Sequence, residues 1–333
     1  MIPPTTTPDE PSVDSLPPPS LSALHDTTSR VQATIARVIE GKPDVIRLAV
    51  TILLAEGHLL IEDVPGVGKT MLAKSLGRSI DCSVSRIQFT PDLMPSDVTG
   101  VSVFNQQTRD FEFKPGGIFA NIVVGDEINR ASPKTQSALL EAMEERQVTV
   151  DGGTYKLDPP FMVVATQNPI EMEGTYPLPE AQRDRFMARL SVGYPADGDE
   201  IAMIDNHAGA DRLESLEPVA DSSDVATLVK TVRTVHVSPA VKQYVVKLAD
   251  ATRRSPDLRL GASPRATLHL IRAAKAWAAL SGRDYVIPDD VQHLAVPVLS
   301  HRLLPTAEAQ IGQRDAGRIV TELVDRIAQP DAG

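Results

Sequence analysis

A glycine-containing turn at Val64–Thr70 limits the possible folds of this chain. A short apolar run, His58–Ile61, precedes the turn, and a helix is predicted to begin near Lys69. The order is therefore strand, loop, helix. Two later runs, Asn121–Val124 and Phe161–Thr166, are continuously apolar, as strands covered on both faces are. Strands alternating with helices predict an α/β fold, a parallel sheet with helices on both faces.

The residue types within the turn suit a phosphate group. Gly66 and Gly68 allow backbone N–H groups to close around phosphate oxygens without a Cβ in the way. Lys69 adds a charge for the β- and γ-phosphates, and Thr70 offers a hydroxyl to Mg²⁺. The usual pattern G-x-x-x-x-G-K-[ST] has glycine where this chain has Asp63. The flanking strand and helix support a phosphate loop despite that departure.

Two acidic residues and an amide follow the later apolar strands. Asp126 and Glu127 end the run that starts at Ile122, which places Asp126 beside the phosphate loop as a ligand for Mg²⁺ or its waters. Glu127 fits a general base or a residue that positions water for attack on the γ-phosphate. Asn168, at the tip of the next strand, could orient that water, although Asn-Pro is also ordinary turn chemistry.

Two arginines are further candidates. Arg185, in Asp184-Arg185-Phe186, could stabilise charge on the transferring phosphoryl group, or it could form a surface ion pair. Arg265 lies in the first turn of a helix that Ser263 caps, where a cation gains nothing from the helix dipole and a nearby anion would explain it.

The chain divides into three parts by composition. Residues 1–25 hold seven of the 27 prolines and predict a flexible tail. Residues 26–197 form the α/β part, with helical periodicity over Ser29–Ala55, a helix at Pro133–Glu145 behind a Ser132 cap, and hairpins near 99–114 and 147–158 that are functional loops or decoration. Residues 198–330 are expected to be helical, without strands. The helices expected there are Asp199–His207, Val225–Val232, Pro239–Thr252, Pro264–Leu280, Asp289–Leu299 and a last one to Ile327.

Charge and cysteine content narrow the function classes. The 44 acidic residues outnumber 33 Lys and Arg, a net charge of −11 that disfavours wholesale nucleic-acid binding. Residues 230–283 carry eleven Lys or Arg and two Asp, which is either a solvated face or a surface for an acidic partner. The single cysteine, Cys82, indicates a reducing compartment, and neither a signal peptide nor a membrane span is evident. We therefore expect a cytoplasmic protein.

Taken in order, Val64–Thr70, Ile122–Ala131, Ala165–Pro169, Glu180–Phe186 and Gly261–Arg265 resemble a MoxR-type AAA+ ATPase. The most family-specific segments are Asp126–Ala131, Lys134–Glu145 and Asn168–Leu178. The resemblance runs from about Val31 to Leu304 and implies an AAA+ core followed by a small all-α lid.

The resemblance also implies roles for individual residues, with ATP and Mg²⁺ as cofactors. Asn168 would be sensor 1 and Arg265 sensor 2, while Arg185 would be an arginine finger reaching a neighbour's nucleotide, with Arg183 as its competitor. Gly41 falls where the family contacts adenine. The nucleotide would be held by Gly41, Pro65, Gly66, Val67, Gly68, Lys69, Thr70, Met71 and Arg265, the metal by Thr70 and Asp126, and catalysis would use Lys69, Glu127, Asn168 and Arg185.

At the level of function, the resemblance implies a ring, typically a hexamer, that remodels or matures client complexes by inserting metal cofactors. A partner with a von Willebrand factor A domain is implied as well. Three alternatives stay open: an ATP-binding switch or scaffold with little hydrolysis, a chelatase-type motor subunit, and a nucleic-acid motor. The low aromatic content of 4% argues against the last, because stacking on bases needs aromatic side chains.

Overall fold

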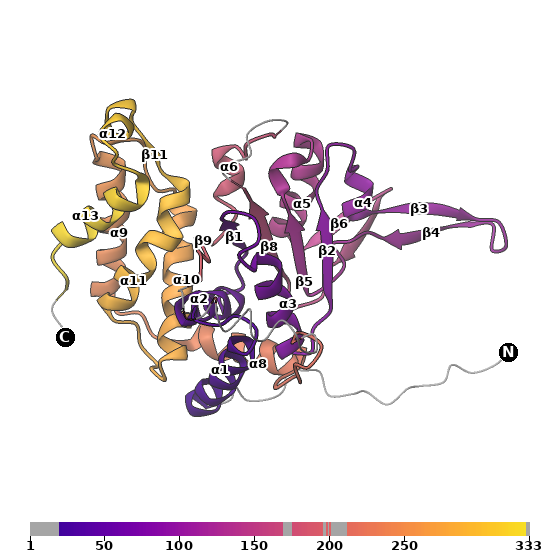
Figure 1. Ribbon diagram of the computed structural model, residues 1–333, viewed down its shortest axis with the longest axis horizontal. Coiled ribbons are helices and arrows are strands. Elements are labelled where there is room, and N and C mark those ends of the chain that lie inside the picture. Colours follow the sequence, from indigo (N-terminus) through magenta and orange to yellow (C-terminus); the bar gives the residue numbers. More distant parts are fainter. Residues whose placement is uncertain (1–19, 169–174, 196–197, 199, 201–211, 331–333) are drawn as a thin grey trace.

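The computed structural model describes residues 20–168, 175–195, 198, 200 and 212–330 (Figure 1). Most of the predicted tail and the helix expected at Asp199–His207 lie outside these residues. At the centre is a five-stranded parallel sheet in the order β2-β5-β8-β1-β9. Its strands are β1 (Leu59–Glu62), β2 (Val84–Gln88), β5 (Ile122–Asp126), β8 (Met162–Gln167) and β9 (Ala188–Leu190).

Burial explains which strands the sequence revealed. In β1, β5 and β8 every residue except the last is buried, so each reads as an apolar run. The edge strand β2 buries only Ile87 and alternates with polar residues, and β9 has three residues. Glu62 pairs with Gln167, and Gln88 with Asp126. The carboxyl ends of β1, β2, β5 and β8 therefore meet at one edge of the sheet.

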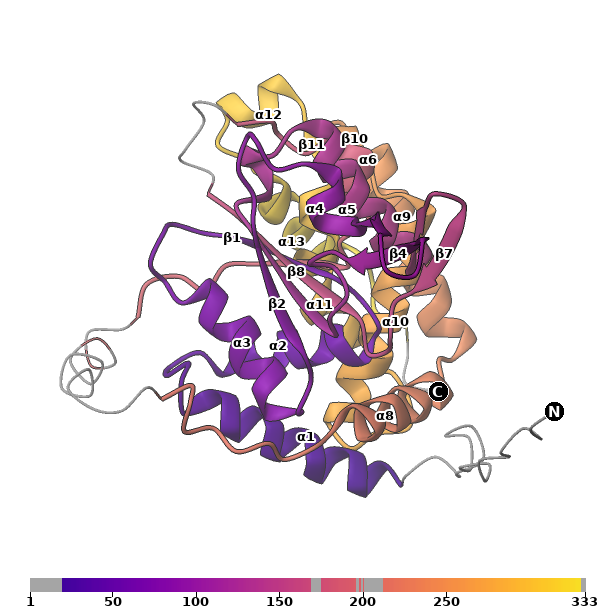
Figure 2. The same ribbon diagram turned by 90° about the vertical axis from the view of Figure 1, so that its right-hand side faces the viewer.

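Helices cover both faces of the sheet (Figure 2). Alternate strand residues face opposite sides, so that Ile122 and Val124 join the apolar cluster of one face and Val123 joins that of the other. One face is covered by α1 (Leu21–Ala36), α2 (Pro43–Leu54) and α3 (Lys69–Ser79), the other by α4 (Pro95–Thr99) and α5 (Pro133–Glu145). The predicted Ser132 cap of α5 is confirmed, since its side chain accepts a hydrogen bond from the Thr135 N–H.

Both predicted hairpins are present. They are formed by β3 (Gly100–Asn105) with β4 (Asp110–Pro115) and by β6 (Gln147–Val150) with β7 (Gly153–Lys156). The β3–β4 hairpin projects from the end of the molecule opposite the C-terminal helices (Figure 1). Its tip carries a cross-strand aromatic pair, Phe104 and Phe111, whose rings are 5.4 Å apart and at least half exposed.

The C-terminal part is mainly helical. Its elements are α8 (Ser222–Thr234), α9 (Pro239–Arg254), α10 (Pro264–Leu280), α11 (Pro288–Leu299), η3 (Ser300–Arg302), α12 (Ala307–Ile311) and α13 (Ala316–Arg326). The expectation that strands stop after Pro195 is wrong, because β10 (Leu258–Leu260) and β11 (Leu304–Pro305) form a small antiparallel sheet. Both strands are too short to give an alternating pattern.

One further expectation, the extent of the N-terminal tail, needs correction. Helix α1 begins at Leu21, inside the predicted tail, because the fully buried Leu24 anchors it to the core. The helical periodicity over Ser29–Ala55 corresponds to the end of α1 and to α2, with a turn between them at residues 37–42 in which Gly41 has φ +69°. Finally, none of the helices in the described part of the chain is long and apolar enough to span a bilayer.

Candidate active site

The phosphate loop connects β1 to α3 at the carboxyl edge of the sheet. Gly66 and Gly68 have φ of +85° and +88°, a left-handed conformation that L side chains rarely adopt. Pro65 and Gly66 are exposed to solvent. Within the described residues, no acceptor is recorded for the backbone N–H of Gly66, Val67 or Gly68. The loop therefore presents donors, at the N-terminus of a helix, to an anion from solvent.

Lys69 and Asp63 lie at the base of this loop. The Lys69 ammonium donates to the Asp63 carbonyl oxygen at 2.7 Å and to the Gln167 carbonyl oxygen at 3.4 Å, which holds it between β1 and β8. The Asp63 carboxylate accepts hydrogen bonds from the Val64 N–H, the Ser191 hydroxyl and the Gly193 N–H. Although burial alone would raise the pKa of this carboxyl, the hydrogen bonds outweigh it, and the pKa is lowered. Asp63 thus stays charged and ties the loop to the end of β9.

The turn at residues 37–42 lies against the same loop. A Cβ at Gly68 would be 3.8 Å from Ile39 Cδ1, and the Lys42 ammonium donates to the Tyr194 carbonyl oxygen at 2.7 Å. Gly41, which the resemblance assigns to adenine contact, is exposed between these two residues. Val67 and Met71 are partly buried against the core.

The acidic pair, Asp126 and Glu127, lies at the end of β5, which is separated from β1 by β8. Asp126 accepts a hydrogen bond from the Thr166 hydroxyl at 2.6 Å, and the same oxygen of Thr166 accepts the Glu127 N–H at 3.0 Å. Glu127 has φ +57°, an unfavourable backbone conformation for a non-glycine residue, and such strain clusters at functional sites. Thr166 fixes both acids, a role that reading the sequence did not reveal.

Strand β2 supplies the other partners of these acids. Arg86 forms an ion pair with Asp126 at 2.6 Å and donates to the Gln88 amide oxygen at 2.8 Å. The Gln88 amide nitrogen donates to the Glu127 carboxylate at 3.1 Å, and Arg130 contacts the same oxygen at 3.1 Å. In this conformation the Glu127 carboxylate is held by these neighbours. Asn168 follows β8 at the same edge and is 6% exposed.

The donor set fits a metal that a nucleotide brings with it. Among the described residues, no group of three or more His, Cys, Asp or Glu side chains is arranged to hold an ion. Mg²⁺ commonly takes one or two protein oxygens and completes its shell with phosphates and water. The Thr70 hydroxyl and the Asp126 carboxylate, which is paired with Arg86 in this structure, would be the protein oxygens of such a site.

The two candidate arginines lie elsewhere, and they lie together. Glu144, at the end of α5, pairs with Arg265 at 2.7 Å and contacts Arg185 at 3.9 Å. Arg265 is also 3.8 Å from Asp184. The competing Arg183, at the end of α6 (Glu180–Arg183), has a buried Nε for which no partner is recorded among the described residues.

This arginine pair is at the amino edge of the sheet. The Met187 N–H donates to the carbonyl oxygen of His58, which precedes β1, and the His58 ring contacts the Met143 carbonyl oxygen. The phosphate loop leaves β1 at its other end. Five residues of strand span roughly 16 Å, so Arg185 and Arg265 are separated from the phosphate loop of their own chain by about the depth of the sheet.

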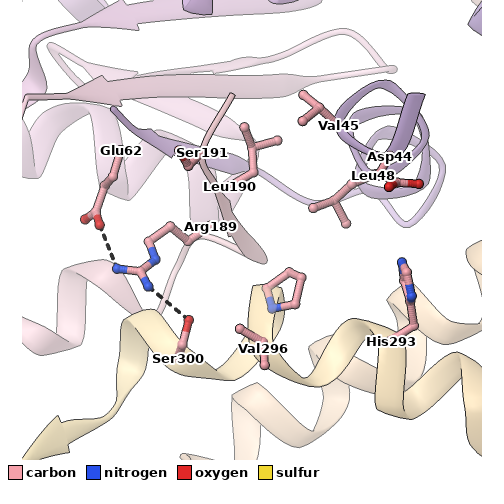
Figure 3. A pocket seen from close by; sticks show the side chains of 11 residues that line it. Asp44, Val45, Leu48, Glu62, Arg189, Leu190, Ser191, His293, Val296 and Ser300 are labelled. Carbon is pink, nitrogen blue, oxygen red and sulfur yellow. Dashed lines mark hydrogen bonds and ion pairs between the residues drawn. The ribbon is translucent and has the colours of Figure 1, made fainter. Parts of the chain in front are cut away.

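A cavity of about 500 Å³ opens between α2, β9 and α11 (Figure 3). Arg189 crosses it, paired with Glu62 at 2.8 Å and donating to the Ser300 hydroxyl at 3.2 Å. None of the residues predicted to hold a nucleotide lines this cavity. It approaches the phosphate loop through Glu62, at the end of β1, and through Ser191, which donates to Asp63.

Comparison with known proteins defines the class. Residues 58–188 match the family model of the ATPase family associated with various cellular activities, and residues 250–323 match the AAA lid domain. A crystal structure of a protein from Cytophaga hutchinsonii superposes with a TM-score of 0.87 at 35% identity, covering 93% of this chain and 97% of that one. The chain is therefore an AAA+ ATPase with a parallel-sheet core and a helical lid.

Relatives narrow the class to one family. Chaperone MoxR1 of Mycobacterium tuberculosis is 40% identical over 93% of this chain and 84% of its own length. Protein MoxR of Methylorubrum extorquens is 31% identical over 85% and 89%, and YeaC of Bacillus subtilis is 50% identical over 92% and 96%. The chain belongs to the MoxR family of AAA+ ATPases.

Proposed function

We propose that this protein hydrolyses Mg²⁺-ATP at sites shared between neighbouring subunits of a ring. The observation that carries the proposal is the separation of the site residues to opposite edges of the sheet. Lys69, Asp126, Glu127 and Asn168 gather at the carboxyl edge, whereas Arg185 and Arg265 lie together at the amino edge. One chain cannot bring both sets to one nucleotide, but a neighbour can supply the second.

In this proposal each group has a distinct task. The N–H groups of Gly66, Val67 and Gly68, with Lys69, bind the phosphates. Thr70 and Asp126 would hold Mg²⁺, which would neutralise charge on the phosphates. Glu127, once released from Gln88 and Arg130, accepts a proton from water that Asn168 orients. The neighbour's two guanidinium groups stabilise the charge on the transferring phosphoryl group.

The test is steady-state ATP hydrolysis by the chain and its Glu127→Gln variant, with mass determination with and without ATP. Loss of the general base should lower turnover by about 10²–10⁴-fold while ATP binding and ATP-dependent assembly persist. Glu141→Gln, an exposed carboxylate on α5, is the matched control and should keep wild-type turnover. Equal turnover in the Glu127→Gln variant and the wild type would contradict the role of Glu127.

A second candidate, an ATP-binding switch with little hydrolysis, has one observation in its favour. The Glu127 carboxylate is engaged by Gln88 and Arg130 and so is not available as a base in this conformation. ATP binding without turnover in the wild type would support this candidate.

The chaperone role rests on the relatives and on the β3–β4 hairpin. We propose that this hairpin contacts the client, because its Val101, Val103, Phe104 and Phe111 are exposed. Movements of the lid, residues 198–330, and the core, residues 26–197, would act on the client through that contact. Maturation of metal-containing complexes and a von Willebrand factor A partner belong to this proposal as implications of the family. A Glu127→Gln ring held on ATP is the reagent with which to capture a client.

A further inference from the structure

Asp184 lies immediately before Arg185, and its hydrogen-bonding and ionic side-chain contacts recorded among the described residues come from the helical domain. Its carboxylate accepts the Ser263 hydroxyl at 2.9 and 3.0 Å, pairs with Arg302 at 3.2 Å and is 3.8 Å from Arg265. Ser263 is the N-cap of α10, the helix that carries Arg265. One carboxylate in the core thus contacts the start of the helix that presents the second arginine.

Arg302, at the end of η3, continues this contact inward. The residue is 3% exposed, and its guanidinium donates to the carbonyl oxygens of Phe186 and Met187 and to His269 Nδ1. Asp184 supplies the negative charge beside it. If the lid moved without the Asp184–Met187 segment, the Arg302 guanidinium would lose the Asp184 carboxylate and the carbonyl oxygens of Phe186 and Met187, and breaking such a buried pair is strongly unfavourable.

We propose that Asp184 is a positioning residue that locks the segment carrying Arg185 to the lid, so that Arg185 and Arg265 move as one rigid pair. The inference rests on the proposed function, in which both arginines serve a neighbour's nucleotide. Within one chain the pair already converges on an anion, the Glu144 carboxylate, at 2.7 and 3.9 Å. The lid is then part of the face that a subunit offers to its neighbour and not a cover over its own nucleotide.

The first measurement is turnover in mixed rings. Asp184→Asn retains the side-chain size and an acceptor for Ser263 but removes the charge that Arg302 and Arg265 face. Misplaced arginines should lower turnover of this variant at least about tenfold without weakening ATP binding by its own intact phosphate loop. Adding Glu127→Gln subunits should restore turnover, because they bring an intact arginine pair to the intact sites of the variant.

Two controls accompany the mixing. Arg185→Ala mixed with Glu127→Gln tests whether an arginine acts across subunits at all. Asp250→Asn, which alters a half-buried carboxylate paired with Arg254 in the same lid, should leave turnover unchanged. If Asp184→Asn does not fold, Ser263→Ala removes the lid side of the same contact and is measured in its place.

The second measurement does not depend on hydrolysis. Spin labels at Ala181 and Val246, both exposed, in a Cys82→Ser background report the distance between α6 and α9 of the lid. In the wild type the distribution of label distances should be narrow and unchanged by ATP. In Asp184→Asn the distribution should be broader.

Each outcome decides between the proposals. The positioning role is overturned if Asp184→Asn has wild-type turnover. It is also overturned if Glu127→Gln subunits restore turnover to Arg185→Ala but not to Asp184→Asn. If Glu127→Gln subunits do not restore turnover to Arg185→Ala, the shared site is overturned instead. The distance between the spin labels is then the test of whether Asp184 holds the lid to the core. A wild-type distance that shifts with ATP, or one that Asp184→Asn leaves narrow, overturns the lock.

Discussion

His58 precedes the interior strand β1, with both ring nitrogens in use. Nε2 contacts the Met143 carbonyl oxygen at 3.1 Å, and Nδ1 accepts the Val163 N–H at 3.0 Å. The polar atoms of this ring are therefore satisfied beside an interior strand of the sheet. Burial lowers the pKa of His58 to about 4. Protonation of Nδ1 would remove the acceptor of the Val163 N–H.

Acid should therefore destabilise the protein through this residue. Because the pKa of His58 is lower in the folded chain than the unfolded value near 6.5, its contribution to stability is intact above about pH 6.5 and is lost as the pH falls toward 4. The full loss is on the order of 3 kcal/mol. The free energy of unfolding, measured in urea between pH 7 and 4, should depend less steeply on pH in His58→Gln than in the wild type. The difference in slope should correspond to about one proton fewer taken up on unfolding.

The matched control is His236→Gln, at an exposed histidine in the lid, which should keep the wild-type slope. His269 and His301 also have pKa values lowered by burial, so part of the slope persists in both variants. An unchanged slope in His58→Gln would show that this ring is not the group that titrates.

At the same scale, the candidate residues for phosphate chemistry are easier to find in the sequence than the side chains that contact them. Asp126 and Glu127 end an apolar strand, so their place was readable. Arg86 and Gln88 contact those acids from β2, an edge strand in which only Ile87 is buried, and an alternating polar strand of five residues resembles a loop. Asp63 was read as a departure from a pattern, because its partners Ser191 and Gly193 are more than 120 residues away.

At the scale of elements, two lid helices begin with the same Ser-Pro sequence but in different surroundings. Ser238 caps α9 by accepting the Val241 N–H, and Ser263 caps α10 by accepting the Ala266 N–H. Only the Ser263 hydroxyl also donates to a carboxylate, that of Asp184. The two sites therefore separate the value of a cap from the value of the contact between lid and core.

Ser238→Ala should cost about 1 kcal/mol of unfolding free energy, the usual value of a lost cap. Ser263→Ala should cost about 2–4 kcal/mol, because it also removes a hydrogen bond to a charged group. Urea unfolding of the two variants beside the wild type measures the difference. Equal losses would mean that the Ser263–Asp184 hydrogen bond contributes no net stability.

Elements were predictable where local signals agree. Helix α5 has a serine cap, a proline in its first turn and helical apolar spacing, and it was placed to the residue. The break between α1 and α2 was missed although Gly41 and Pro43 mark it, because apolar spacing continues on both sides. Strands β9, β10 and β11 have two or three residues each and depend on pairing with distant segments, which no local pattern encodes.

At the scale of the whole molecule, charge is unevenly distributed. Residues 230–283 carry a net +9, which leaves −20 on the rest of the chain. In the proposed ring, the basic stretch 230–283 of one subunit would face acidic groups of the next, and attraction between exposed charges is screened by salt.

Assembly in ATP should therefore weaken as salt rises. The mass of the Glu127→Gln protein, which does not consume its ATP, should shift from rings toward smaller species between about 0.05 and 0.5 M NaCl, as the screening length falls several-fold. Sedimentation at the two salt concentrations measures the shift. A mass distribution indifferent to salt would indicate that the subunit contact is apolar.

Strand β9 has only three residues, yet Arg185 lies just before it and the donors that hold Asp63, Ser191 and Gly193, lie just after it. In the proposed ring, one end of this strand senses the nucleotide of the next subunit while the other shapes the chain's own phosphate loop. The nucleotide state of one site would then alter the phosphate loop of the adjoining subunit, always in the same direction around the ring. ATP turnover would therefore depend cooperatively on the fraction of sites filled.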